Sequence, residues 1–185
     1  MNDMSGVPAR AIWSDDELVE SGSVIPEVPI TASFTFRAPS GALFDFLPGQ
    51  FLTLEIPAPG GTVLRTYTIS SSPSRPRSIS ITAKAQDDSI GTRWMLENLA
   101  PGVQIKALGP AGLFSHLNHA AEKYLFISAG SGITPMMSMT TFMFDLGSEP
   151  DIVFVNCARS PGEIIFSERL EQIACRVPGI GLKWV

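Results

Sequence analysis

Residues 124–137 read Tyr-Leu-Phe-Ile-Ser-Ala-Gly-Ser-Gly-Ile-Thr-Pro-Met-Met. The apolar start predicts a buried strand, Gly130 and Gly132 predict a tight turn, and Thr134-Pro135 predicts the start of a helix. A helix N-terminus presents unpaired N–H groups and the positive end of a dipole, so this unit suits a diphosphate. The spacing alone is not specific, because the dinucleotide fingerprint has a third glycine where this chain has Pro135.

The composition is that of a globular protein. The chain has 185 residues, of which 44% are hydrophobic and 17% charged, and its net charge is −5. This acidic balance argues against a protein that binds nucleic acid or an anionic membrane. We find no apolar leader and no run of 18 apolar residues, and therefore expect a cytoplasmic protein without a signal peptide or membrane span.

Two cysteines are too few for a disulfide framework or a cysteine-ligated iron–sulfur cluster. We expect Cys157 and Cys175 to be core or near-core residues. His116 and His119 have no acidic or cysteine partner at ligand spacing, and we expect both at the surface. The methionines that follow the glycine turn are expected to pack in a helical core; they are Met136, Met137, Met139 and Met143.

Short apolar stretches separated by turn residues fill the chain before residue 122. They predict strands at 30–37, 51–56, 63–69, 78–84 and 103–108, and a helix at 91–99. Five or six short strands at near-regular spacing favour an antiparallel barrel or sandwich. Residues 1–10 are expected to form a loose tail.

The strand 63–69 carries Arg65, Tyr67 and Thr68 within four residues. Side chains alternate along a strand, so Arg65 and Tyr67 share one face, and Thr68 points to the other unless the strand is bent. The helix that starts near Ser89-Ile90-Gly91-Thr92 is a second candidate anion site.

The chain after residue 122 is expected to form an α/β unit, with the boundary between Asn118 and Glu122. Residues 151–156 are an apolar run typical of a parallel strand that is covered on both faces. The run from Ser160 to Glu163 predicts a capped helix start, with Ile165, Phe166, Leu170 and Ile173 on the buried helical face. Another strand is expected to begin at Leu182.

Four motifs occur in one order along the chain: Arg65-x-Tyr67-Thr68, Gly91-Thr92, Gly109-Pro110-x-Gly112-x-Phe114 and Gly130-x-Gly132-x-x-Pro135. This series resembles the ferredoxin–NADP reductase superfamily from about residue 12 to the end. The resemblance implies a β plus α/β fold, with an antiparallel six-stranded flavin-binding barrel at 11–119. A parallel-sheet NAD(P)-binding domain follows at 122–185 and is expected to be incomplete at its C-terminus.

The resemblance also implies roles for the residues of the barrel. Arg65 pairs with the flavin phosphate. Tyr67 packs against the isoalloxazine, and Thr68, where the family more often has Ser, hydrogen-bonds near flavin N5; these two are the candidate catalytic residues. The other implied flavin contacts are the backbone of Ala83 and Lys84 and the helix start at Gly91, Thr92 and Arg93.

In the second half, the resemblance implies that Gly130 and Gly132 let a dinucleotide pyrophosphate approach and that Thr134-Pro135 opens the helix. Arg159 and Ser160 are implied to contact the adenosine ribose. A 2′-phosphate held by Arg159 would favour NADPH, whereas stacking on adenine would suit NADH, and the sequence leaves both open.

The phrases Gly91-Thr92-Arg93-Trp94-Met95 and Ala158-Arg159-Ser160-Pro161 resemble reductases of Rieske-type oxygenases, including those that demethylate betaine-like amines. The implied reaction is hydride transfer from NAD(P)H to FAD, with FMN still open, followed by electron transfer to an iron–sulfur acceptor or oxygenase component. No metal ligands are expected in this chain, which has no Cys-x4-Cys-x2-Cys run.

We expect the chain to be a fragment of a longer protein, because a short parallel sheet would leave an apolar edge open. The alternative is that the chain passes its electrons to a separate carrier protein. Two other functions are compatible with the motifs. One is the reductase arm of a hybrid-cluster or flavohaemoglobin-like system, and the other is a truncated, non-catalytic flavin-binding module.

Overall fold

Six antiparallel strands and one helix form the first half of the chain in the computed structural model, which describes residues 11–185. The tail expected at 1–10 lies outside the described residues. The elements of this half are β1 (Val19–Val28), β2 (Thr31–Arg37), β3 (Phe51–Ala58), β4 (Gly61–Thr68), β5 (Ile79–Lys84), α1 (Ile90–Asn98) and β6 (Gln104–Ala111). The predicted segments in this half agree with the observed ones to within a few residues at each end.

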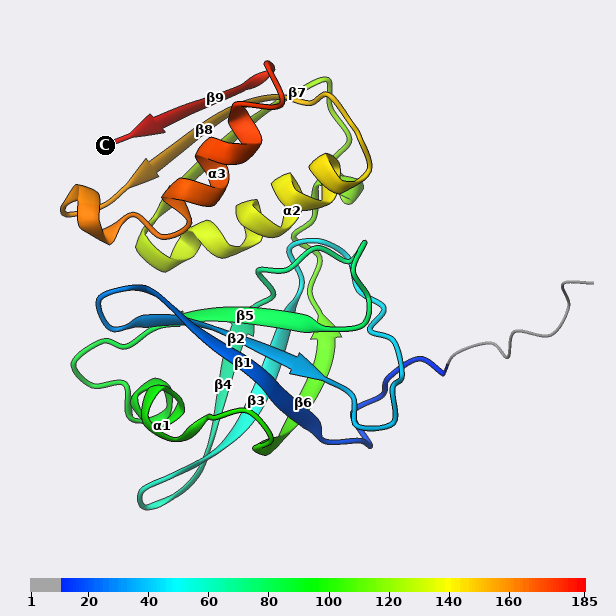
Figure 1. Ribbon diagram of the computed structural model, residues 1–185, viewed down its shortest axis with the longest axis vertical. Coiled ribbons are helices and arrows are strands. Elements are labelled where there is room, and N and C mark those ends of the chain that lie inside the picture. The colour runs from blue at the N-terminus through cyan, green and yellow to red at the C-terminus, as the bar shows by residue number, and fades with distance from the viewer. Residues whose placement is uncertain (1–10) are drawn as a thin grey trace, which may run out of the picture.

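The six strands close into a barrel. Their order is β4-β3-β6-β1-β2-β5, so β4 and β5 are the two ends of the sheet (Figure 1). A bridge between Ile69 and Ile81 joins these ends, and the backbone N–H of Ser70 donates to the oxygen of Ser80 at 2.8 Å. The predicted barrel is therefore confirmed.

Alternation of side chains fills the barrel. On β3, Leu52, Leu54 and Ile56 are fully buried, and Phe34 and Phe36 of β2 point into the same core. This is the pattern expected where one face of a strand meets the core. Strand β2 starts one residue later than predicted, because Ile30 lies in the β1–β2 turn with a φ of 54°.

The second half contains a parallel sheet in the order β7-β8-β9. Its elements are the 3-10 turn η1 (His116–Asn118), β7 (Lys123–Ala129), η2 (Gly130–Ile133), α2 (Thr134–Asp145), β8 (Asp151–Cys157), η3 (Pro161–Glu163), α3 (Ser167–Ala174) and β9 (Ile180–Trp184). Helices α2 and α3 cover one face of the sheet, and α2 lies between the sheet and the barrel (Figure 1). The other face exposes Leu125, Ile127 and Val153.

The expectation of a capped helix at Ser160 is wrong. Residues Pro161–Glu163 form a single 3-10 turn, the side chain of Ser160 makes no capping hydrogen bond, and α3 begins only at Ser167. Phe166, with a φ of 63°, separates the two. Glu163 is not free to cap, because its carboxylate binds Lys84 of the barrel. The four apolar residues predicted for the buried face are buried nevertheless.

Three predicted exposures are also wrong. Cys157 and Cys175 are exposed rather than core residues, because Cys157 ends β8 at the rim of the sheet and Cys175 follows the end of α3. His116 is buried, because the rings of Tyr124 and Phe142 pack against it. His119 is exposed as predicted, and Met137, Met139 and Met143 are core residues as predicted.

Polar contacts join the two halves. Arg75 binds Asp145 of α2 with two hydrogen bonds of 3.0 and 2.6 Å, and Ser138 Oγ of α2 donates to the backbone oxygen of Ser71 at 2.6 Å. Lys84 and Glu163 form a third link, described below. Within residues 11–185, no helix is long and apolar enough to cross a membrane.

Candidate functional site

Helix α1 packs against β3 and β4, and its first turn lies next to Arg65. A Cβ atom at Gly91 would be 3.2 Å from Val63 Cγ2 and 3.3 Å from Arg65 Cγ, which is tighter than nine in ten real Cβ contacts. Glycine therefore lets the first turn of α1 approach the strand this closely. The side chain of Arg65 is exposed, and its Nη1 donates to the backbone oxygen of Leu64 at 2.8 Å.

The N-terminus of α1 has no side-chain cap. Ser89 stands at the N-cap position, but its hydroxyl donates to the backbone oxygen of Gln86 at 2.8 Å, and the first turn contains no acidic residue. The positive end of the helix dipole and the first-turn N–H groups of Gly91 and Thr92 therefore lie where α1 packs against the Arg65 side chain. This pairing of a helix N-terminus with an arginine fits a phosphate group.

Tyr67 is tied to the same helix. Its hydroxyl is 3.0 Å from the hydroxyl of Thr92, which is itself buried. Burial raises the pKa of the Tyr67 phenol, against smaller opposing effects of Thr92 and Arg65, so the ring remains neutral near neutral pH. Thr68, the last residue of β4, is half-buried and pairs with Phe51 across the sheet.

The backbone of β5 has a free edge beyond the bridge at Ile81. Ala83 and Lys84 pair with β2 on one side only, since the described sheet ends with β5. Ala83 is buried, and the side chain of Lys84 crosses to the second half, where Nζ donates to Glu163 Oε2 at 2.7 Å. The free strand edge is compatible with a ligand that binds backbone groups.

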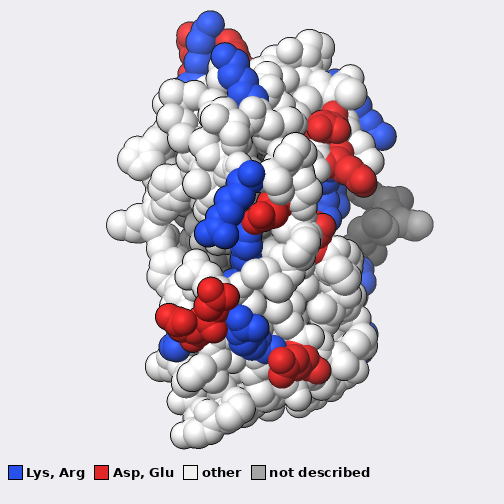
Figure 2. Space-filling view, turned by 90° about the vertical axis from the view of Figure 1, so that its left-hand side faces the viewer, with Lys and Arg blue, Asp and Glu red and all other residues white. Residues whose placement is uncertain are grey.

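A cleft of about 750 Å³ separates the barrel from the carboxyl ends of β7 and β8. Its lining includes Lys84, Gly130, Ser131, Arg159 and Glu163. Figure 2, which shows the side on which β8 ends, has basic side chains gathered midway up this face, with an acidic side chain beside them. In open α/β sheets, ligands bind in the crevice outside the carboxyl ends of the strands.

The glycine turn leaves room beside the cleft. Gly130 has a φ of 50°, and a Cβ atom at Gly130 or at Gly132 would meet no protein atom within 4 Å. Thr134 Oγ1 donates to the backbone oxygen of Ser131 at 3.1 Å, and Pro135 occupies the first turn of α2. The turn is a 3-10 segment that runs directly into α2, so the predicted strand–turn–helix unit is present.

The structure groups the candidate residues in two places. Arg65, Tyr67, Gly91 and Thr92 come together where α1 meets β4, and a second group lies at the cleft: Lys84, Gly130 and Arg159. The loop of residues 86–88 connects them, because it lines the cleft and receives a hydrogen bond of 3.3 Å from Arg93 Nη2 to the Gln86 oxygen. Ser160, Gly132, Thr134 and Pro135 do not line the cleft.

Glu163 lines the cleft, a position that its sequence pattern did not indicate. The hydrogen bond from Lys84, the largest effect, lowers the pKa of its carboxyl group, and the charges of Lys84 and Arg159 act in the same direction. Its partner is 79 positions away in the chain, so no local pattern could have indicated the pair.

Comparison with known proteins gives two family matches. Residues 22–116 match the oxidoreductase FAD-binding domain, and residues 126–185 match the oxidoreductase NAD-binding domain. The chain is 61% identical over 175 residues to the stachydrine N-demethylase reductase subunit of Rhizobium meliloti. The aligned region covers 95% of this chain and 50% of that protein. It is 45% identical to the glycine betaine monooxygenase reductase subunit of Pseudomonas aeruginosa PAO1, covering 92% and 47%.

The chain thus spans about half the length of these curated relatives. Among solved structures, the flavohem-like FAD/NAD-binding domain of nitric oxide dioxygenase from Vibrio cholerae superposes with a TM-score of 0.83 at 22% identity. It covers 91% of this chain and 73% of that one. This likeness shows the same fold.

Proposed function

Because the chain belongs to the oxidoreductases that join an FAD-binding domain to an NAD-binding domain, we propose that it transfers hydride from NADH or NADPH to FAD. In this proposal the flavin domain is residues 11–119 and the nucleotide domain is residues 122–185. The observation that carries it is the meeting of Arg65, Tyr67 and the uncapped N-terminus of α1 on one side of the barrel.

These residues fit the parts of a flavin. Arg65 and the first turn of α1 would hold the phosphate groups, since both present hydrogen-bond donors and positive charge. Tyr67, kept neutral and positioned by Thr92, would pack against the isoalloxazine, and Thr68 would hydrogen-bond at its N5 edge. The free edge of β5 at Ala83 and Lys84 would contact the flavin through backbone groups. The flavin supplies the redox chemistry, and the chain supplies position and charge.

The cleft at the carboxyl ends of β7 and β8 would receive the pyridine nucleotide. The open space at Gly130, which lines the cleft, and at Gly132 beside it would admit the pyrophosphate. Arg159 in the cleft and its neighbour Ser160 would contact the adenosine ribose. Arg159 offers a positive charge to a 2′-phosphate, while Glu163 in the same cleft opposes a second negative charge. NADH and NADPH are therefore to be distinguished by experiment.

The relatives at 61% and 45% identity are named as reductase subunits of a demethylase and a monooxygenase. We propose by analogy that the electrons pass to an iron–sulfur acceptor or oxygenase component, without a role in binding nucleic acid or membranes. A cytoplasmic location would fit the use of pyridine nucleotides. The second candidate function is that of a reductase in a flavohaemoglobin-like system, because the chain shares its fold with the flavohem-like FAD/NAD-binding domain.

An absorbance spectrum tests the proposal. The purified chain with FAD should show flavin bands near about 370 and 450 nm that bleach on anaerobic addition of NADH or NADPH. Bands that persist with both coenzymes would identify a flavin-binding module without reductase activity. A chain that retains neither FAD nor FMN after dialysis would contradict the proposal.

Two variants test the assignments. Arg65→Ala removes a charge-assisted pair worth roughly 1.5–3 kcal/mol and should weaken FAD binding roughly 10- to 150-fold, whereas Arg77→Ala, another exposed arginine, should not. Arg159→Ala should raise KM for NADPH alone if a 2′-phosphate is bound. Equal effects on both coenzymes would exclude that role.

A further inference from the structure

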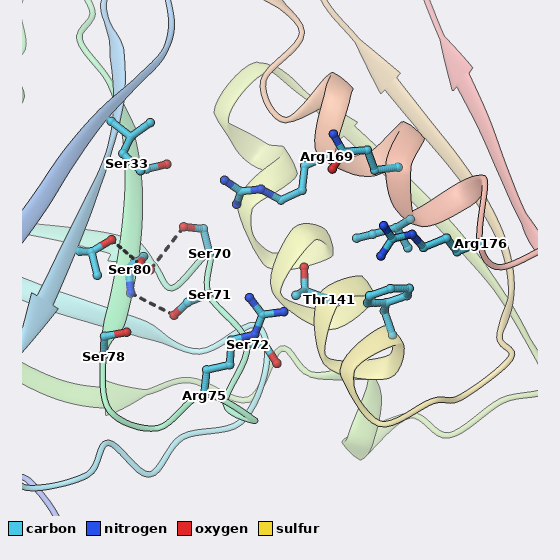
Figure 3. A pocket seen from close by; sticks show the side chains of 15 residues that line it. Ser33, Ser70, Ser71, Ser72, Arg75, Ser78, Ser80, Thr141, Arg169 and Arg176 are labelled. Carbon is cyan, nitrogen blue, oxygen red and sulfur yellow. Dashed lines mark hydrogen bonds between the residues drawn. The ribbon is translucent and has the colours of Figure 1, made fainter.

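A second cavity, of about 460 Å³, lies between the barrel and helices α2 and α3. It shares no lining residue with the cleft described above. Strands β2 and β5, the segment of residues 70–72 and Arg75 of the same loop form one wall, and α2, α3 and Arg176 form the other (Figure 3). The cavity is therefore a separate space in the same interface.

The barrel wall of this cavity is made of hydroxyl groups. Ser33 and Ser70, both buried, lie 2.7 and 2.9 Å from the hydroxyl of Thr82, and Thr35 lies 2.9 Å from Ser80. The hydroxyl of Ser71 accepts a hydrogen bond of 2.9 Å from the backbone N–H of Ser80. Surfaces buried between two domains are usually more apolar at their centre. This wall instead presents hydroxyls: Ser33 also donates to Glu27, whereas Ser71 accepts one bond and can still donate its proton to a ligand.

Three arginines line the space between the two walls, Arg75 from the barrel loop and the other two from the helical side. Arg169 extends from α3 toward the barrel, Arg176 follows the end of α3, and Arg75 reaches toward Thr141 (Figure 3). Asp145 neutralises Arg75, and Glu27 lies 3.9 Å from Arg169. Three guanidinium groups thus face two carboxylates, although the chain as a whole is acidic.

Thr141 of α2 adds a polar group that has no partner. Its Oγ1 is buried and makes no hydrogen bond to any of residues 11–185. Buried polar atoms are almost always hydrogen-bonded, and a turn about χ1 would bring this closed-off hydroxyl to the cavity that Thr141 lines. Phe144 and Ile173 provide apolar surface next to it.

We propose that this cavity binds a small phosphate monoester with an apolar body. Guanidinium groups match the oxygens of a phosphate in pairs, and the hydroxyls and Thr141 can complete its hydrogen bonds. Phe144 and Ile173 would contact the apolar part. The volume is in the range of small-molecule sites, which combine an apolar lining with a few polar groups.

The test is a calorimetric titration of the chain, saturated with FAD, with phenyl phosphate at low salt. Inorganic phosphate and phenol serve as probes for the two halves of the ligand. The cavity variants are Arg169→Gln, Arg176→Gln and Thr141→Val. Arg77→Gln, an exposed arginine of the same loop as Arg75 that does not line the cavity, is the matched control.

Phenyl phosphate should bind at one site, and more tightly than inorganic phosphate or phenol. Its affinity should be at least about tenfold lower in Arg169→Gln and in Arg176→Gln than in the unaltered chain. Thr141→Val should also weaken it, and Arg77→Gln should not. Binding that is absent at about 10 mM, or unchanged in all three cavity variants, overturns the proposal. Arg65→Gln and Arg159→Gln separate it from the coenzyme sites: if they abolish the binding, phenyl phosphate occupies one of those sites and the proposal fails.

Discussion

Replacement of Gly49 by alanine tests the contact that fixes the barrel against the second half. Gly49 lies in the turn before β3, with a φ of 98°. A Cβ atom there would be 2.1 Å from the backbone oxygen of Phe114 and 2.6 Å from Cε of Met139. Phe114 belongs to the segment that leaves the barrel, and Met139 belongs to α2, so three parts of the chain meet at this glycine.

Two effects add in Gly49→Ala. A left-handed backbone at a non-glycine residue destabilises the fold by about 1–2 kcal/mol. The lower conformational entropy of the unfolded chain with alanine offsets about 0.4–1 kcal/mol of this loss. The methionine end can move away, but a carbonyl of the backbone cannot move without its segment. Relief of the overlap should therefore cost about 2 kcal/mol more, within the usual range for overpacking.

Gly41→Ala is the matched control, because Gly41 has a φ of 79° and a Cβ atom there would meet nothing within 4 Å. Urea unfolding should show a loss of about 1 kcal/mol for Gly41→Ala and about 3 kcal/mol for Gly49→Ala. If the two losses differ by less than about 0.5 kcal/mol, the close approach of Phe114 and Gly49 is not a feature of the molecule in solution.

Three further predictions concern ionisable groups. Burial pushes the pKa of Asp145 upward, but hydrogen bonds from Arg75, Ser74 and Ser72 outweigh it and hold the pKa below 3.8. The ionised form is favoured in the fold, so stability should fall as pH drops below 3.8, and Asp145→Asn should flatten this part of the unfolding profile. Burial lowers the pKa of His116 from 6.5; stability should therefore decline as pH falls below 6.5, and His116→Phe should lose that dependence in urea midpoints between about pH 5 and 8. Lys84→Gln should return the pKa of the Glu163 carboxyl group toward 4.5, as followed by NMR titration, and Lys123→Gln, which alters a surface pair with Asp151, should leave it unchanged.

The sequence by itself determined the local structure of this protein. The alternation in residues 30–37 and 51–56 gave the inward faces of β2 and β3, because a strand that meets a core on one side must alternate. The glycines at 130 and 132 marked the turn before α2, where Gly130 has a left-handed backbone that glycine adopts without strain. The order of the motifs indicated the family, which the comparisons confirmed. The assignment of individual site residues stays a prediction.

The tertiary structure decided what those elements meet. Glu163 had the local pattern of a helix cap, but it binds Lys84 because the barrel lies within reach of its carboxylate. His116 looks like a surface residue in the sequence and is buried, because Tyr124 and Phe142 fold over it. Neither contact has a sequence signature. Strand and turn patterns depend on neighbours in the chain, whereas burial and ion pairing depend on segments that only folding brings together.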